Sequence, residues 1–152
     1  HMVVSSGGPI CSCGKPGHLE AYASAPAIVN RFRERLNGSG IDAHGRWASG
    51  AITVRAIFAA AAEGDETAQE VVEETVRMLG MAVANLITVV NPACVVVGGA
   101  VAEAGEHLMN PLSARVRQYA YPASMRRARL ALSQLGADAT VLGAVALALG
   151  NE

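Results

Sequence analysis

The sequence has few aromatic residues and few charged ones. Aromatic residues make up 4% of its 152 residues and charged residues 16%, whereas 51% are hydrophobic. We therefore expect a core of small aliphatic side chains between closely packed helices, within one compact domain. The formal net charge of −1 excludes a broad electrostatic attraction to nucleic acid or to an anionic membrane.

The sequence also lacks a long uninterrupted apolar run and a signal peptide. Its longest apolar stretch, residues 83–97, is interrupted by Asn85, Asn91 and Pro92, so it does not predict a membrane span. We expect a cytoplasmic location, where thiols stay reduced and can bind metal. The chain begins with His1-Met2 instead of a methionine, which favours a piece cut from a longer protein.

The pattern of apolar residues and turn signals predicts an α/β fold. We expect a short strand and a turn over 3–9, a surface loop or hairpin over 37–52, and strands over 94–99 and 129–134. Because residues 94–99 (CVVVGG) are a continuous run around three valines that ends in two glycines, that strand is predicted to be buried on both faces. Helices are predicted over 18–36, 54–62 (capped by Thr53), 66–90 (capped within 64–67), 101–105, 106–119 and 137–149.

The helix over 66–90 has the strongest pattern. Apolar residues recur there every three or four positions, and Asn91-Pro92 ends it because a residue before proline avoids helical geometry. Gly80 and Ala84 lack bulk, so we expect another helix to approach closely at that point.

Cys11, Cys13 and His18 form a short cluster of metal-binding residue types. A structural zinc site needs four ligands, and these three alone leave an ordinary polar loop as an open alternative. The C-x-C spacing differs from the C-x-x-C of redox proteins, which weakens a disulfide-exchange interpretation. Cys94 is different, because it lies in the apolar strand and is predicted to be a core cysteine.

His1 supplies a fourth residue of the right type, ten positions before Cys11. With it, HMVVSSGGPICSCGKPGHLE resembles the zinc motif of the ROK family, H-x9-C-x-C-G-x2-G-[C/H]-x-E, with His18 where a third cysteine is common. The resemblance continues through LEAYAS (19–24), NPACVVVGGAV (91–101) and LGADATVLGAVALAL (135–149). It covers nearly the whole chain and corresponds to the C-terminal half of the family's proteins.

The resemblance implies an actin-like, ribonuclease H-like ATPase fold. Residues 1–152 would be its C-terminal lobe, made of a zinc knuckle (1–20) and an α/β part (21–152), with the N-terminal lobe absent. The implied zinc ligands are His1, Cys11, Cys13 and His18.

The resemblance also implies ligand sites. Glu20 and His1 would contact a hexose or an N-acetylated hexose; the alternative for Glu20 is a helix-capping carboxylate. Gly98 and Gly99 would lie against ATP, and the alternative for them is a tight strand-to-helix turn. Ala100 departs from the family pattern, which often has a third glycine at that position.

Two activities are compatible with this resemblance. Kinases of the family phosphorylate a hexose with ATP and Mg²⁺, and the run LEAYASAPAIVNR favours the glucokinase type. Their aspartate base and D-x-G-x-T phosphate loop lie upstream, so we assign no catalytic residue here. Repressors of the family bind DNA through an N-terminal helix-turn-helix, also upstream. A zinc-stabilised oligomerisation module is the third hypothesis, and a homodimer is expected in every case.

Overall fold

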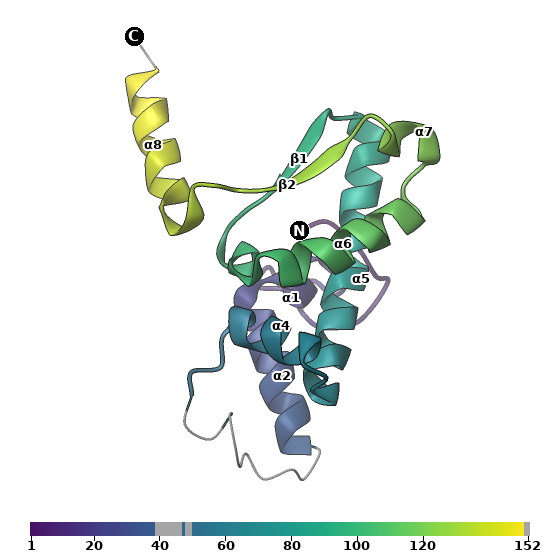
Figure 1. The fold of residues 1–152 in the computed structure, drawn as a ribbon, viewed down its shortest axis with the longest axis vertical. Helices are drawn as coiled ribbons and strands as arrows, with labels where there is room; N and C mark the ends of the chain where they lie inside the picture. The colour runs from purple at the N-terminus through teal and green to yellow at the C-terminus, as the bar shows by residue number, and fades with distance from the viewer. Residues whose placement is uncertain (39–46, 48–49, 151–152) are drawn as a thin grey trace.

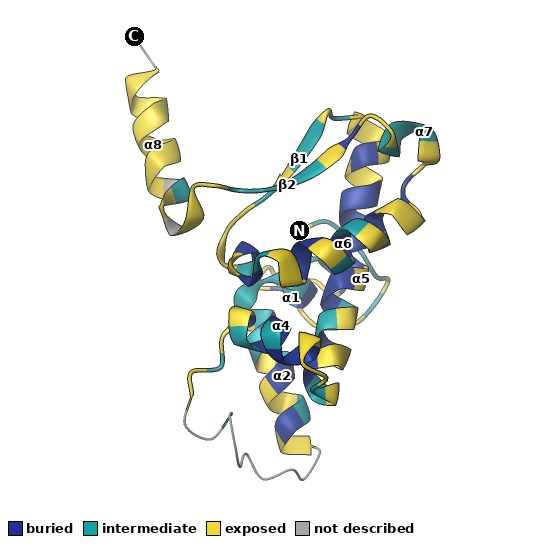
Figure 2. Ribbon diagram, viewed as in Figure 1, coloured by how far each residue is buried: buried dark blue, intermediate teal, exposed yellow. Residues whose placement is uncertain are grey.

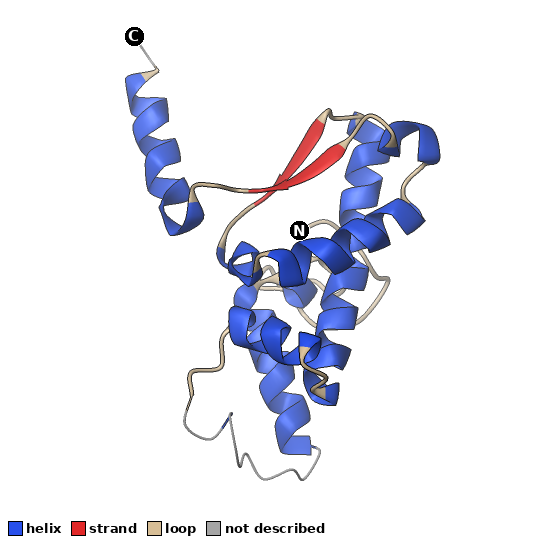
Figure 3. Cartoon of the chain, viewed as in Figure 1, coloured by secondary structure: helices blue, strands red, loops and turns tan. Residues whose placement is uncertain are grey.

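The computed structural model describes residues 1–38, 47 and 50–150, and it combines a group of helices with a two-stranded parallel sheet (Figures 1 and 3). The α/β prediction is thus confirmed. In chain order the elements are α1 (Glu20–Ala23), α2 (Ala25–Gly38), α4 (Val54–Ala62), α5 (Glu66–Val90), β1 (Cys94–Val97), the 3-10 helix η1 (Ala100–Ala104), α6 (Glu106–Tyr119), α7 (Pro122–Met125), β2 (Arg129–Leu132), the 3-10 helix η2 (Gly136–Asp138) and α8 (Ala139–Leu149).

Helix α5 is the central element and has the predicted bounds. The Asp65 side chain accepts a hydrogen bond from the Ala68 N–H at 2.9 Å, and Asn91 ends the helix in the left-handed conformation with φ 50°. Helix α6 crosses α5 closely, since a Cβ atom on Gly80 would lie 2.6 Å from Cγ of Arg115. The predicted close approach at Gly80 is therefore confirmed.

The core lies between α2, α4, α5 and α6, whose buried faces point toward one another (Figure 2). Helix α4 begins as predicted, because the Thr53 hydroxyl accepts a hydrogen bond from the Ala56 N–H at 3.2 Å. The largest fully buried side chains of the core are Phe32, Phe58, Ile28, Ile57, Ile87, Leu108 and Leu112, and alanines fill much of the remainder.

The single helix predicted over 18–36 is wrong, because the chain breaks at Ser24. Ser24 is extended (φ −75°, ψ 152°), and its hydroxyl accepts a hydrogen bond from the Ala27 N–H at 3.3 Å. Pro26 has no N–H with which to continue α1 into α2, but it is tolerated in the first turn of a new helix. The break leaves α1 as a separate short turn beside the first 19 residues.

Strand β1 pairs in parallel with β2, from Cys94 opposite Arg129 to Val97 opposite Leu132. Val95 and Val97 pack against the helical core, whereas Val96 points to the other face and is 62% exposed. The predicted burial of both faces is therefore wrong for this chain, because no described element covers the second face. Cys94 is half-buried instead of a core residue for the same reason.

The C-terminal helix α8 stands apart from the other helices (Figure 1), and residues 141–150 are exposed. Its position and length match the predicted helix over 137–149. None of the described helices is both long and apolar enough to span a bilayer. Most of the loop or hairpin predicted over 37–52, with His44, lies outside the described residues.

Candidate functional site

The first 19 residues fold back on themselves into a small knuckle. Val3 and His18 form an isolated antiparallel bridge, and Ile10 and Pro16 form another. The Leu19 N–H donates to the Met2 carbonyl at 2.8 Å, which ties the start of the chain to the beginning of α1. The strand predicted over 3–9 is thus reduced to a single bridge.

Gly8, Gly14 and Gly17 of this knuckle all have positive φ, and the last two permit the turns around the cysteines. Gly14 has φ 82°, and its N–H donates to the Cys11 carbonyl at 2.9 Å. Gly17 has φ 74° and is buried, and a Cβ atom there would lie 2.0 Å from the Ser5 carbonyl oxygen. Only glycine combines this backbone conformation with so close an approach.

The turns bring the four predicted ligands together. One donor atom from each of His1, Cys11, Cys13 and His18 lies within 4.8 Å of all the others. His1 Nδ1 is 3.3 Å from Cys11 Sγ, and Cys13 Sγ is 3.2 Å from His18 Nδ1.

The four side chains are of the types that bind zinc, and their spacing can be compared with that of a tetrahedral zinc site. Zinc–nitrogen and zinc–sulfur bonds of about 2.0–2.3 Å in a tetrahedron separate the ligand atoms by about 3.3–3.8 Å. Two thiols and two imidazoles are suitable zinc ligands; the separations of 3.3 and 3.2 Å lie close to the lower end of that range, and the other separations are at most 4.8 Å. Cys11 and His18 are buried, whereas His1 and Cys13 are exposed. The cluster therefore lies at the surface, with two of its four side chains packed into the protein.

The surroundings of Cys11 favour its thiolate form. A hydrogen bond from the Cys13 backbone N–H is the main cause that lowers the pKa of the Cys11 thiol, and the side chains of His18 and Ser12 add to it against the opposing effect of burial. A thiolate is the form that binds metal.

Glu20 begins α1 beside the cluster, with Oε2 3.6 Å from His1 Nδ1. A hydrogen bond from the Ser12 side chain is the main cause that lowers the pKa of the Glu20 carboxyl. Glu20 also lines a pocket of about 360 Å³, together with Ser12 and with Asn30 and Arg31 of α2. An ionised carboxylate in a pocket of this size can accept hydrogen bonds from the hydroxyl groups of a small ligand.

The predicted nucleotide residues form the turn between β1 and η1. Gly99 has φ 77°, so the turn needs a glycine there whether or not it binds a ligand. A pocket of about 370 Å³ lies beside this turn, between Ala100 and Glu103 on one side and Val29 and Asn30 of α2 on the other.

Asn30 lines both of these pockets, and the sequence analysis did not single it out. The pocket that contains Glu20 and the pocket beside the glycine turn are therefore neighbours along α2. No local pattern distinguishes Asn30 from other polar residues of an amphipathic helix, because its position depends on how α2 packs.

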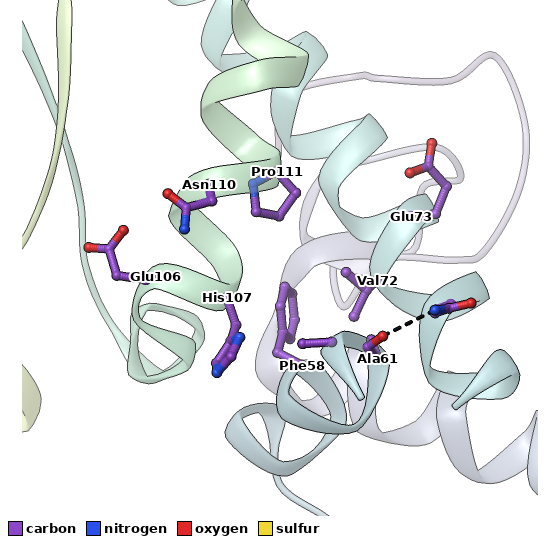
Figure 4. Close-up of a pocket in the computed structure, with 10 residues that line it drawn as sticks. Phe58, Ala61, Val72, Glu73, Glu106, His107, Asn110 and Pro111 are labelled. Carbon is purple, nitrogen blue, oxygen red and sulfur yellow. Dashed lines mark hydrogen bonds between the residues drawn. The ribbon is translucent and has the colours of Figure 1, made fainter. Parts of the chain in front are cut away.

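A third pocket, of about 540 Å³, lies between α4, α5 and α6 (Figure 4). Phe58 and Val72 supply apolar surface, and His107 and Asn110 supply polar groups from α6. Figure 4 shows His107 directed into the space beside Phe58. His107 is exposed, and none of the predicted site residues lines this pocket.

Comparison with known proteins identifies relatives over nearly the whole chain. The model of the ROK family matches residues 1–151. A glucokinase of Halalkalibacterium halodurans is 36% identical over 148 residues, which cover 93% of this chain and 43% of the relative. The chain thus spans less than half the length of that enzyme.

Two solved structures share the fold. A ROK family glucokinase from Streptomyces griseus in complex with glucose and AMPPNP has a TM-score of 0.78 and 30% identity, over 97% of this chain and 49% of that one. A ROK family transcriptional regulator, a homolog of the E. coli MLC protein, has a TM-score of 0.72 and 30% identity, over 87% of this chain and 33% of the regulator. Both a kinase and a regulator therefore resemble this chain.

Proposed function

Because the chain belongs to the ROK family, we propose that it is the C-terminal lobe of an ATP-dependent hexose kinase of the glucokinase type. The lobe binds the sugar beside a structural zinc ion and contributes one side of the nucleotide site. The observation that carries the proposal is the four-ligand cluster with the Glu20 carboxylate 3.6 Å from one of its imidazoles.

The knuckle would hold zinc through His1, Cys11, Cys13 and His18. The metal would supply a rigid link between the start of the chain and the Cys11–His18 turn, a structural role and not a reacting one. That link keeps His1 beside Glu20, even though the His1 side chain is 60% exposed.

Glu20 would bind the sugar. A glutamate carboxylate is ionised at neutral pH, and the lowered pKa of Glu20 favours that form further, so it can accept hydrogen bonds from two adjacent hydroxyl groups. The pocket of about 360 Å³ at Glu20 offers Asn30 and Arg31 as further polar partners. A hexose or an N-acetylated hexose is the class of ligand that matches a carboxylate, an amide and a guanidinium in one pocket.

The nucleotide would lie against Gly98 and Gly99, next to the pocket that Ala100 and Glu103 line. Since Asn30 lines this pocket and the sugar pocket, the two substrates would meet along α2, as a direct phosphoryl transfer requires. Phosphoryl transfer also needs a group that orients the hydroxyl and a cradle for the phosphates and Mg²⁺. Those groups are expected upstream, so this lobe positions substrates and does not itself catalyse.

A sugar-responsive repressor is the second candidate, because the similarity to the regulator structure has the same 30% identity as that to the glucokinase structure. The sugar site would then serve as an effector site. A protein extended to the relatives' length would separate the two, since only the kinase releases ADP when hexose and ATP are added.

Calorimetry on that extended protein tests the role of Glu20. Glu20→Gln keeps the size of the side chain and removes its charge, and we expect hexose affinity to fall by about 1.5–3 kcal/mol. The control, Glu70→Gln, alters a glutamate whose side chain is 68% exposed on α5. Unchanged hexose affinity in Glu20→Gln would leave Glu20 as a helix-capping residue.

A further inference from the structure

Tyr22 joins the knuckle to α1 through its hydroxyl group. The side chain is 4% exposed, and the hydroxyl donates a hydrogen bond to the Gly7 carbonyl at 3.1 Å. A Cβ atom on Gly8 would lie 1.9 Å from that hydroxyl oxygen. The chain between His1 and Cys11 therefore passes directly over the end of the Tyr22 ring.

The same residue is fixed to the helical core from the other side. Arg31 Nη2 of α2 donates to the Tyr22 carbonyl at 3.0 Å and to the Thr75 hydroxyl of α5 at 2.6 Å. Thr75 is fully buried, and its hydroxyl donates to the Val71 carbonyl at 2.8 Å. The guanidinium is held by an ion pair as well, with Arg31 Nε 3.2 Å from Glu74 Oε2.

We propose that Tyr22 is a positioning residue that holds the metal knuckle and Glu20 in a fixed relation, with Arg31 and Thr75 fixing Tyr22 to the core. The two groups that it connects are the loop between His1 and Cys11 and the short helix that begins with Glu20. This inference rests on the proposed metal site, because that site is what the loop carries.

The hydroxyl group, and not the ring, carries this role. If only the ring mattered, phenylalanine would fill the same space in the core as tyrosine. The hydrogen bond to Gly7 is directional, and it orders a loop that zinc binding would otherwise have to order. One hydrogen bond of ordinary net strength changes an equilibrium constant by a factor of about 3–10.

The first test is Tyr22→Phe with Tyr121→Phe as its control, because Tyr121 is 61% exposed. Zinc affinity is measured by competition with a chelator. We expect Tyr22→Phe to bind zinc about 3- to 10-fold more weakly, while its cobalt-substituted form keeps the absorption spectrum of two thiolate and two imidazole ligands. Equal zinc affinity in Tyr22→Phe and Tyr121→Phe would overturn the proposal.

The second test removes the contact with Arg31. Thr75→Val keeps the shape of the side chain, and Thr88→Val is the matched control, since Thr88 lies on the same helix and donates to the Ala84 carbonyl at 2.8 Å. We expect zinc affinity to fall in Thr75→Val and to stay constant in Thr88→Val. If the two variants respond alike, Thr75 acts only on α5 and its part of the proposal is wrong.

A measurement without metal separates this inference from the proposed function. Hydrogen exchange of residues 1–19 in the metal-free chain reports directly how firmly the loop is held. We expect faster exchange in Tyr22→Phe and in Thr75→Val than in their controls. If the unaltered chain binds no zinc, the proposed metal site is refuted, and so is its coupling to Tyr22. Zinc binding with unchanged exchange and affinity in Tyr22→Phe would refute the role of Tyr22 alone.

Discussion

The substitution Gly17→Ala gives a quantitative test of how the knuckle is built. Gly17 and Gly14 both have positive φ, of 74° and 82°, so alanine at either position costs about 1–2 kcal/mol for the left-handed backbone alone. The two positions differ in their neighbours. Nothing lies within 4 Å of a Cβ atom on Gly14, whereas a Cβ atom on Gly17 would lie 2.0 Å from the Ser5 carbonyl oxygen.

The additional cost of Gly17→Ala follows from what the methyl group displaces. The segment that includes Ser5 must move away, which breaks the hydrogen bonds from the Val4 N–H to the Gly17 carbonyl (2.9 Å) and from the Leu19 N–H to the Met2 carbonyl (2.8 Å). At about 0.5–1.5 kcal/mol net for each bond, Gly17→Ala should cost about 1–3 kcal/mol more than Gly14→Ala.

Denaturant unfolding of both variants measures the difference, and zinc analysis of the same samples adds a second signal. Because the displaced segment carries His1, Gly17→Ala should also lose zinc, whereas Gly14→Ala should retain it. Equal unfolding free energies and equal zinc contents in the two variants would refute the description of the knuckle given above.

Three further predictions concern the metal, the packing of α5 against α6, and self-association. The purified chain should hold about one zinc ion, and Cys13→Ser should lose it. Metal analysis over falling pH should show zinc release as the ligands take up protons. In the metal-free chain, the lowered pKa of Cys11 makes its thiolate stabilise the fold at high pH, and this stabilisation is lost as the pH falls through the lowered pKa. Gly80→Val should lower the melting temperature because its side chain collides with Arg115, while Gly143→Ala, with nothing within 4 Å, should be neutral or stabilising by up to about 1 kcal/mol. Light scattering at micromolar concentration should detect self-association that removal of residues 139–152 abolishes, since Leu147 and Leu149 of α8 are each 74% exposed; a monomer with α8 present would contradict this.

The elements that the sequence predicted well are those whose signals are local. Helix α5 has a 25-residue apolar repeat with Asp65 before it and Asn91 after it, so its bounds could be predicted without knowledge of its partners. The four candidate ligands also lie within 18 consecutive residues, and the glycines between them determine the turns. That proximity is why a cluster could be expected before the structure was known.

The contacts that the sequence did not predict join residues far apart in the chain. The bond between Arg31 and Thr75 spans 44 residues, and the shared position of Asn30 depends on how α2 packs against the turn after β1. The break at Ser24 was missed for a different reason. Apolar periodicity continues across it, and only the hydroxyl cap and Pro26 mark the end of one helix and the beginning of another.

The wrong predictions of burial for β1 have a cause that also concerns self-association of the chain. A β-branched run such as CVVV is typical of a strand covered on both faces, yet Val96 is 62% exposed, and α8 is apolar along its length but exposed too. A segment as apolar as these is most stable when another part of a protein covers it. This chain spans only 43% of the length of the glucokinase that it resembles. Both surfaces are therefore more apolar than their exposure in this chain explains. An apolar helix exposed to water lowers its free energy by pairing with another apolar surface, and for the chain by itself the available surface is a second copy. The self-association experiment is consequently a test of this explanation of β1 and α8 as well.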